Sequence, residues 1–249
     1  MDYTPSYKDL LAISGDVKRY LGFLSDLGVT GFDCSDKSLE TLVNWGKPKK
    51  NVPVTANVKP ETLEIILADL EDCNRCLLGS RKKNLVFGRG NPDARLMFIG
   101  EAPGFEEDAM GIPFVGVSGQ LLSKMIEGMG LSRDDVYIAN ILKCRPTENR
   151  NPLPEEINAC FPFLERQIMA VKPDVICTLG AFATQALLGK PEGVSRLRGR
   201  FHEYRSIPVM PTFHPAYLLR NPGSKREAWE DLKKIMTVLG LKKPAASND

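Results

Sequence analysis

The sequence predicts an α/β protein, a three-layer α/β/α sandwich built around a four-stranded parallel sheet. Four short apolar runs lie at wide intervals, at residues 95–99, 136–141, 174–179 and 207–211. Helical patterns fill the intervals, and strands that alternate with helices pair in parallel through right-handed crossovers. The 249 residues are 43% hydrophobic, which is enough for one substantial core with a small appendage.

The first 60 residues are predicted to form a small helical extension and a linker. Residues 7–27 place leucine and valine at helical spacing, and residues 33–45 form a shorter helical pattern. Residues 46–60 are rich in proline and lysine and lack periodicity, which is typical of a linker. The expected divisions are the extension and linker over 1–60, the main domain over 61–239 and a tail over 240–249.

The helices of the main domain are predicted from their spacing of apolar residues. A first helix over residues 61–72 follows Pro60, and a last one spans residues 225–239. The helical patterns between the strands lie at 118–129, 154–171 and 181–188. In an open parallel sheet the ligand binds beyond the carboxyl ends of the strands, so the residues that follow each apolar run form the candidate site.

Polar or turn-forming residues follow all four apolar runs. The first run leads into Gly100-Glu101-Ala102-Pro103-Gly104, and the second ends at Asn140. The third ends at Gly180-Ala181, a tight turn into a helix N-terminus whose free N–H groups suit a phosphate. The last leads into His214, one of two histidines in the chain. Together these residues predict one active site at a single edge of the sheet.

Four of the six cysteines form a pattern with metal-ligand spacing: Cys73 and Cys76 as a CxxC pair, then Cys144 and Cys160. Four thiolates bind zinc or an iron–sulfur cluster. A redox dithiol at the CxxC pair is the alternative, but it leaves the other two without a role. Cys177 lies in an apolar run and is interpreted as a core residue.

The compartment expected from the sequence is the cytoplasm. No run of eighteen apolar residues is present, which argues against a membrane-spanning helix. The N-terminal residues lack the basic start and apolar stretch of a signal peptide. Disulfides are rare in a reducing compartment, so metal ligation is favoured for the cysteines.

The net charge of +2 hides an uneven distribution. Residues 1–72 carry 12 acidic and 8 basic side chains, a balance of −4, which leaves 19 acidic and 25 basic for residues 73–249, a balance of +6. Arginines gather at residues 196–205, where Arg198 and Arg200 lie, and again near Arg220. Such basic clusters suit contacts with phosphates.

An ordered set of motifs resembles the family 4 uracil-DNA glycosylases over about residues 61–239. The motifs are GEAPG followed by ED, then GIPFVG, N-x3-CRP and HPAYLLRNP, together with the four cysteines. The resemblance implies a [4Fe–4S] cluster on Cys73, Cys76, Cys144 and Cys160. It also implies a prokaryotic enzyme that acts at the nucleoid and excises uracil from DNA. The first 60 residues lie outside it.

The resemblance implies a role for each pocket residue. Asn140 is expected to read O4 and N3–H of a flipped uracil, and Phe114 to stack on its ring. A turn asparagine and a core phenylalanine are the structural alternatives. Ala102, Glu107 and Asn149 are expected to complete the substrate pocket.

His214 and Glu101 are the predicted catalytic residues together with Asn140. His214 is expected to donate a hydrogen bond to O2 of the leaving uracil anion. Ala102 occupies the place of an aspartate in a related family, and alanine cannot polarise water. Glu101, held by Glu107 and Asn149, is therefore the carboxylate expected near the sugar, where it acts electrostatically or orients other groups.

The residues expected to contact DNA lie around this pocket. Leu218 or Leu219 is expected to wedge into the gap left by the flipped base, although at least one of them suits the core. Arg220 is expected to grip a phosphate. The other predicted contacts are Ser118, Gly119, Gly180, Ala181, Arg198 and Arg200.

The function predicted is hydrolysis of the N-glycosidic bond of deoxyuridine in DNA, which releases uracil and leaves an abasic site. One alternative is a variant of the family that becomes covalently trapped on DNA. Another is a non-catalytic, metal-stabilised nucleic-acid-binding module. We expect a monomer whose partner is uracil-containing DNA, with residues 1–60 docking a protein partner and no membrane association.

Overall fold

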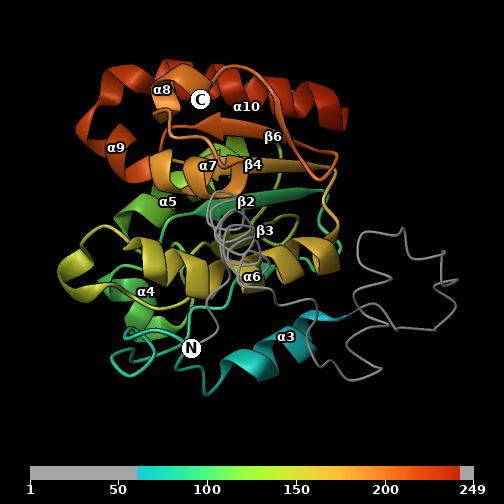
Figure 1. Cartoon of the computed structure of the whole chain (residues 1–249). Coiled ribbons are helices and arrows are strands. Elements are labelled where there is room, and N and C mark those ends of the chain that lie inside the picture. The colour runs from blue at the N-terminus through green and yellow to red at the C-terminus, as the bar shows by residue number, and fades with distance from the viewer. Residues whose placement is uncertain (1–60, 242–249) are drawn as a thin grey trace, which may run out of the picture. The chain divides into compact units, whose positions relative to one another are not determined.

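The computed structural model describes residues 61–241 (Figure 1). The helices predicted at 7–27 and 33–45, the linker at 46–60, Cys34 and residues 242–249 of the predicted tail lie outside this range. Among residues 61–241, no helix combines the length and the apolar character that crossing a bilayer requires.

The centre of the fold is a six-stranded mixed sheet with the order β1-β3-β2-β4-β6-β5. The four predicted strands form its parallel centre: β2 (Leu96–Gly100), β3 (Tyr137–Asn140), β4 (Val175–Leu179) and β6 (Ile207–Thr212). β1 (Arg89–Gly90) and β5 (His202–Tyr204) pair antiparallel at the two edges. The predicted four-stranded parallel sheet therefore lacks the two antiparallel strands that lie at its edges.

The parallel strands are buried and end at the same edge of the sheet. Every residue of β2, β3 and β4 is buried, which explains why they form continuous apolar runs in the sequence. The pairing brings Gly100 level with Asn140 and Leu179 level with Thr212. The segments that follow these residues therefore emerge side by side.

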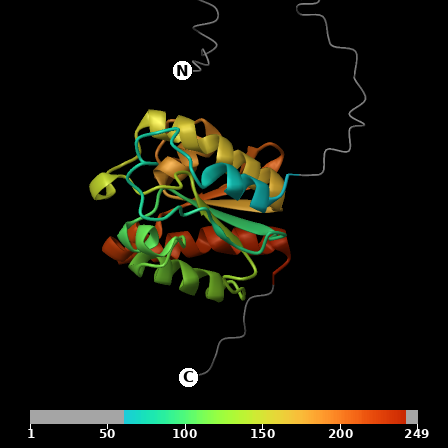
Figure 2. The ribbon, with the colours of Figure 1, turned by 90° about the horizontal axis from the view of Figure 1, so that it is seen from below.

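Helices cover both faces of the sheet (Figure 2). On one face lie α6 (Pro154–Val171) and α7 (Ala181–Leu188), with α3 (Leu63–Leu70) packed on α6. On the other face lie α5 (Val117–Gly128) and α10 (Lys225–Leu239). Each face has its own apolar core, so the layers agree with the predicted α/β class.

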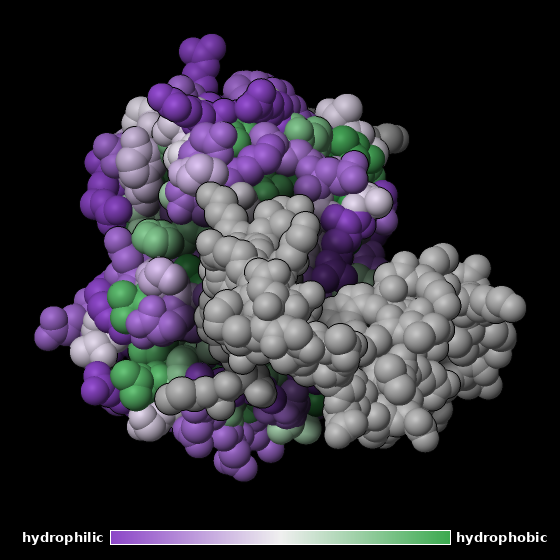
Figure 3. Space-filling view, in the orientation of Figure 1, coloured by the Kyte–Doolittle hydropathy of each residue, from purple (hydrophilic) through white to green (hydrophobic). Residues whose placement is uncertain are grey.

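Shorter elements complete the described chain. These are α4 (Phe105–Met110), α8 (Val194–Leu197), α9 (Pro215–Arg220) and the 3-10 helices η1 (Thr147–Asn149) and η2 (Pro222–Ser224). The face of the molecule in Figure 3 is mostly hydrophilic where the structure describes it, with small separate apolar patches. α4 and α9 follow strands β2 and β6 directly, so they frame the edge at which the polar residues converge.

Candidate active site

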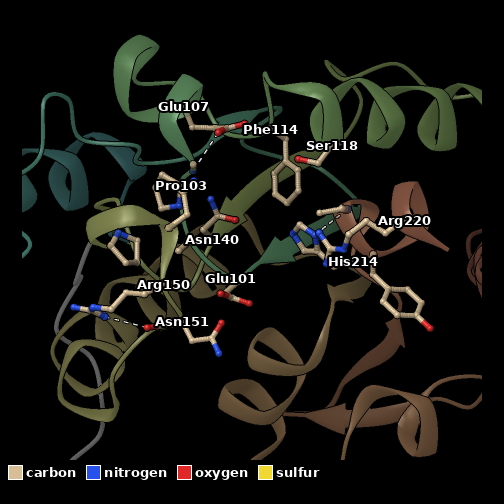
Figure 4. A pocket seen from close by; sticks show the side chains of 16 residues that line it. Glu101, Pro103, Glu107, Phe114, Ser118, Asn140, Arg150, Asn151, His214 and Arg220 are labelled. Atoms are coloured by element: carbon tan, nitrogen blue, oxygen red, sulfur yellow. Dashed lines mark hydrogen bonds between the residues drawn. The ribbon is translucent and has the colours of Figure 1, made fainter.

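A cavity of about 430 Å³ opens at the carboxyl edge of the parallel strands. It contains nine residues that the sequence placed in the site: Glu101, Ala102, Glu107, Phe114, Ser118, Asn140, Asn149, His214 and Arg220. Their side chains come from segments after β2, β3 and β6, and those of Glu101, Phe114, Asn140 and His214 surround one common space (Figure 4). The other lining residues, to which the sequence analysis gave no individual role, are Pro103, Gly104, Pro146, Arg150, Asn151, Ala216 and Tyr217.

Asn140 is the last residue of β3 and is only 1% exposed. Its Oδ1 is, among the described residues, the one buried side-chain nitrogen or oxygen atom without a hydrogen-bond partner. Its backbone carbonyl accepts a 2.7 Å hydrogen bond from Nζ of the buried Lys143, whose Nζ also donates to Gln167 at 2.6 Å. The backbone of Asn140 is therefore fixed, while its side-chain oxygen is left without a partner. Buried acceptors are normally satisfied, so this oxygen is a candidate to accept a hydrogen bond from a ligand N–H.

The absence of a side chain at Gly100 leaves a narrow space between Asn140 and Phe114. A Cβ atom at Gly100 would lie 2.4 Å from Asn140 Oδ1 and 2.5 Å from Phe114 Cζ. The ring centroid of Phe114 is 5.7 Å from that of His214. An aromatic ring and a planar amide that meet over a glycine form a slot suited to a flat, polar ligand.

Phe114 is held in an uncommon backbone conformation by its surroundings. Its φ is +53°, and Arg133 donates to its carbonyl at 3.0 Å and to that of Pro113 at 2.8 Å. A Cβ at Gly119 would lie 1.9 Å from the same Phe114 carbonyl oxygen. The close approach of α5 therefore depends on glycine at position 119.

His214 presents a neutral imidazole to the cavity. Its Nδ1 accepts a 3.1 Å hydrogen bond from the N–H of Ala216, which leaves the ring proton on Nε2. Burial, the largest cause, and the charge of Arg220 together lower the pKa of His214 to about 4, although the charge of Glu107 opposes them. Gly180 has a φ of +91°, and a Cβ there would lie 3.1 Å from Cβ of His214. The ring is thus a hydrogen-bond donor without a formal charge.

The two glutamates of the cavity differ in their surroundings. Burial raises the pKa of Glu101 above its usual value. Glu107 accepts hydrogen bonds from the N–H groups of Gly104 (3.1 Å), Val115 (3.0 Å) and Gly116 (3.1 Å). It therefore ties two walls of the cavity together.

The predicted support of Glu101 is not found in these hydrogen bonds. Those of Glu107 run to backbone groups, and Asn149 Oδ1 accepts from Arg145 at 2.7 Å. Glu101 lines the cavity with its carboxyl group free of any hydrogen bond within the described part of the chain.

Comparison with known proteins identifies the family. Residues 87–233, more than half of the chain, match the uracil DNA glycosylase superfamily. The chain belongs to this superfamily. Curated relatives include the type-4 uracil-DNA glycosylases of Saccharolobus solfataricus, 44% identical over 73% of this chain and 88% of the relative, and of Archaeoglobus fulgidus, 42% identical over 74% and 96%. That of Thermotoga maritima is 44% identical over 73% of this chain and 96% of its own. The resemblance seen in the motifs is confirmed.

The predicted DNA-contacting residues of this superfamily member fall into two groups. Leu219 is 39% exposed and Arg220 is exposed at the mouth of the cavity, and Arg200 is also exposed. Leu218 is only 1% exposed and packs with Phe213 and Ala228, so it is a core residue.

Three of the remaining predicted contacts have structural roles, namely Arg198, Gly119 and Gly180. Arg198 donates to both carboxylate oxygens of the buried Asp231, at 2.9 and 3.0 Å. Gly119 and Gly180 provide clearance for Phe114 and His214. Ser118 and Ala181 are half-buried in the first turns of α5 and α7.

The four cysteines of the predicted cluster are unpaired: Cys144 is buried, and Cys73, Cys76 and Cys160 are half-buried. Burial raises the pKa of Cys144 to about 12, with Cys160 the next largest cause and Cys76 and Cys73 weaker ones. Cys160 Sγ accepts a 3.3 Å hydrogen bond from the N–H of Lys143. Within residues 61–241 no group of three or more His, Cys, Asp or Glu side chains is arranged to hold a metal ion. The donor chemistry nevertheless fits an iron–sulfur cluster, because such clusters are ligated by four cysteine sulfurs and accept N–H hydrogen bonds at sulfur, as Cys160 does here.

Proposed function

We propose that this protein excises uracil from DNA by hydrolysing the N-glycosidic bond of a flipped deoxyuridine. The observation that carries the proposal is the unpartnered Oδ1 of Asn140, buried beside Phe114 in a cavity that His214 also lines. The names of the relatives support the same activity. The products are free uracil and an abasic site, and the strand stays intact.

Base recognition rests on the amide of Asn140. Its Oδ1 accepts from N3–H of uracil and its Nδ2 donates to O4, while Phe114 stacks on the ring. Cytosine has an acceptor at N3 and a donor at its exocyclic amine, so both hydrogen bonds are lost. A buried Oδ1 that already lacks a protein partner then remains unsatisfied, which disfavours cytosine.

Cleavage of the N-glycosidic bond requires stabilisation of the negative charge on the leaving uracil and of the positive charge on the sugar. The Nε2–H of His214 donates to O2 of uracil, where negative charge develops as the bond breaks. Glu101 lies near the cationic sugar and stabilises it electrostatically or orients the attacking water. Ala102 lines the same cavity and has no group that activates water.

DNA is held around the mouth of the cavity. Leu219 wedges into the gap left by the flipped nucleotide, and Arg220 and Arg200 contact phosphates. The first turns of α5 and α7 offer further phosphate contacts, through Ser118, Gly119, Gly180 and Ala181.

Cys73, Cys76, Cys144 and Cys160 would hold a [4Fe–4S] cluster. When bound, it joins the chain segments that carry the four cysteines and has a structural role. Iron and acid-labile sulfide at four of each per chain, with lowered thermal stability in Cys160→Ser, would support this assignment. Zinc in place of iron would contradict it.

The remaining parts of the proposal concern organisation. Residues 61–239 form the catalytic domain, the protein acts as a monomer, and residues 1–60 dock a protein partner. Deletion of residues 1–58 is expected to preserve uracil release and to reduce partner binding. Unchanged partner binding after this deletion would argue against docking by the extension.

The decisive experiment is multiple-turnover release of uracil from a labelled oligonucleotide. The parent protein is expected to turn over, and His214→Ala to lose most of this activity. His202→Ala is the matched control, because His202 lies on the edge strand β5. Equal release by His214→Ala and the parent would reject the role of His214. Binding without release would favour the non-catalytic module, and a stable DNA adduct would favour the covalent variant.

A further inference from the structure

A second cavity of about 500 Å³ adjoins the active-site cavity. The two share six lining residues: Gly104, Glu107, Ser118, Asn149, Ala216 and Arg220. A strand whose flipped nucleotide fills the first cavity therefore has the second directly beside it. None of the proposed catalytic steps uses this space.

The second cavity has an unusually apolar rim for an exposed surface. Phe105, the first residue of α4, is 57% exposed, and Val117 and Leu219 are 61% and 39% exposed. These side chains come from α4, α5 and α9, so three elements contribute to one rim. Exposed apolar groups gathered around a hollow are typical of a binding surface.

Two cations lie over the ring of Phe105, which is 57% exposed. Lys83 Nζ lies 5.4 Å and Arg145 Cζ 5.1 Å from the ring centroid, within cation–π range. Arg220 adds a third cation to the lining. A partner that suits this rim has a flat apolar face and a negative charge beside it.

Two carboxylates also line the second cavity, and they differ in exposure. Glu107 accepts three backbone N–H groups. Glu106 is exposed, and its Oε2 lies 2.0 Å from the place that a Cβ at Gly116 would take. The cations Lys83, Arg145 and Arg220 therefore outnumber the one exposed carboxylate at this rim.

We infer that the second cavity binds the nucleotide next to the flipped deoxyuridine, with its base stacked on Phe105. The inference rests on the proposed function. Lys83 and Arg145 then contact the phosphate of that nucleotide. Stacking on an aromatic ring tolerates every base, because each base has a π-face. The site thus adds affinity for the strand without adding sequence preference.

The test is a double-mutant cycle between Phe105 and each neighbouring base. Single-turnover uracil release at subsaturating protein is measured with single-stranded oligonucleotides. Their 5′ or 3′ neighbour of uracil is either intact or replaced by a base-less tetrahydrofuran. The proteins are the parent, Phe105→Ala, Phe105→Trp and Met110→Ala. Met110 is the matched control, because it is 60% exposed at the other end of α4.

Removal of one neighbouring base is expected to slow the parent by about 5- to 150-fold. Phe105→Ala should show the same loss on intact DNA and no further loss on the base-less strand. Phe105→Trp should release uracil at the rate of the parent, because tryptophan also stacks on a base, and Met110→Ala should match the parent. At saturating protein the release rate of Phe105→Ala should differ little from that of the parent. These results would identify a base on Phe105.

Two results would overturn the inference: Phe105→Ala equal to the parent, or a loss that is the same with and without each neighbouring base. The second result would point to a protein partner or a structural role at this rim. Absence of uracil release by the parent would instead reject the proposed function, so the two failures are distinguishable. Thermal unfolding of Phe105→Ala should match the parent, since the ring is largely exposed.

Discussion

At the scale of single residues, Asn140 combines burial with an unsatisfied acceptor. An oxygen in this state costs the folded protein about 1–3 kcal/mol, because it has lost water and gained no partner. Lys143 Nζ donates a hydrogen bond to the backbone carbonyl of Asn140, so the side-chain amide is not needed to hold the backbone in place. Such a loss of folding stability is consistent with a side chain that is held ready to bind a ligand.

Asn140→Ala is therefore expected to separate activity from stability. Uracil release should fall by about 100-fold or more, as for the loss of a catalytic hydrogen-bonding group. The free energy of unfolding should stay level or rise, since an unsatisfied oxygen is removed from the wall of an open cavity. Chemical denaturation and single-turnover release measure the two effects. A large loss of stability would support the alternative of a turn asparagine.

The pH dependence of release is expected to reflect a neutral His214. Its pKa of about 4 lies below the ordinary 6.5, so the folded protein binds this proton only near pH 4. The rate should show no inflection near pH 6.5, and a fall in acid should reflect His214 and the raised pKa of Glu101. A pH–rate profile under single-turnover conditions measures this. A loss of rate centred at pH 6.5 that persists in Glu101→Gln would contradict the assignment of His214.

The same shift has a consequence for stability with a defined sign. Below pH 6.5 the unfolded chain binds a proton at His214 that the folded chain does not. The free energy of unfolding should therefore decline as the pH falls from 6.5 towards 4, and His214→Gln should flatten the decline. Denaturation at several pH values measures the difference.

At the scale of elements, α5 and the turn before it position the aromatic wall of the site. The helix approaches the Phe114 carbonyl so closely that only glycine fits at position 119. Arg133 holds the same turn from the other side through two backbone carbonyls. The stacking ring therefore depends on a residue that never meets the base.

Gly119→Ala is expected to lower the free energy of unfolding by about 1–3 kcal/mol, since its Cβ forces the backbone to shift. Uracil release should fall as Phe114 moves. Gly128→Ala in the same helix is the control, because its Cβ would lie 3.2 Å from the Trp229 ring, a side chain that can adjust. Its stability should stay within about 1 kcal/mol of the parent. Equal behaviour of both variants would contradict this role for Gly119.

The larger elements could be predicted because burial leaves a pattern in the sequence. The bounds of α6, α7 and α10 agree with those expected, and β2, β3, β4 and β6 lie within one or two residues of the predicted runs. β1 and β5 were missed, because strands of two and three partly exposed residues carry no apolar run. α4 was missed because its six residues are too few and too polar for an apolar helical pattern, although two of its acidic residues are buried.

The sequence predicted the residues of the active site more accurately than the residues that support it or contact DNA. The strand-end rule brought Glu101, Asn140 and His214 to one edge, as the cavity confirms. Nothing in the sequence could separate Leu218 from Leu219, because which of two adjacent residues is buried depends on how α9 packs. The support of Phe114 by Arg133 likewise depends on a tertiary contact between residues 19 and 20 positions apart.

At the scale of the whole molecule, the arginine cluster at residues 196–205 divides between structural and exposed side chains. Arg198 binds Asp231 of α10, whose side chain is fully buried, and Arg205 binds Glu165 of α6 at 2.8 Å. Arg200 is exposed. Spacing in the sequence groups these residues, whereas the fold assigns them to different neighbours.

Arg198→Ala and Arg200→Ala are therefore expected to differ. Arg198→Ala should lower the free energy of unfolding by about 3 kcal/mol, because it leaves a buried carboxylate unpaired. Arg200→Ala should leave stability within about 0.5 kcal/mol and reduce the slope of log affinity against log salt by about one. Denaturation and DNA-binding titrations at several salt concentrations test both. A stability loss in Arg200→Ala with an unchanged salt slope would contradict its role at a phosphate.

The short antiparallel strands at both edges of the sheet have a consequence for crowded conditions. A β-strand of another molecule forms few backbone hydrogen bonds when it pairs with β1 or β5, because these strands are only two and three residues long. The sheet is thus closed to polymerisation through its edges, even though its centre consists of apolar strands. Concentrated protein should therefore stay free of filaments as long as the two edge strands remain paired.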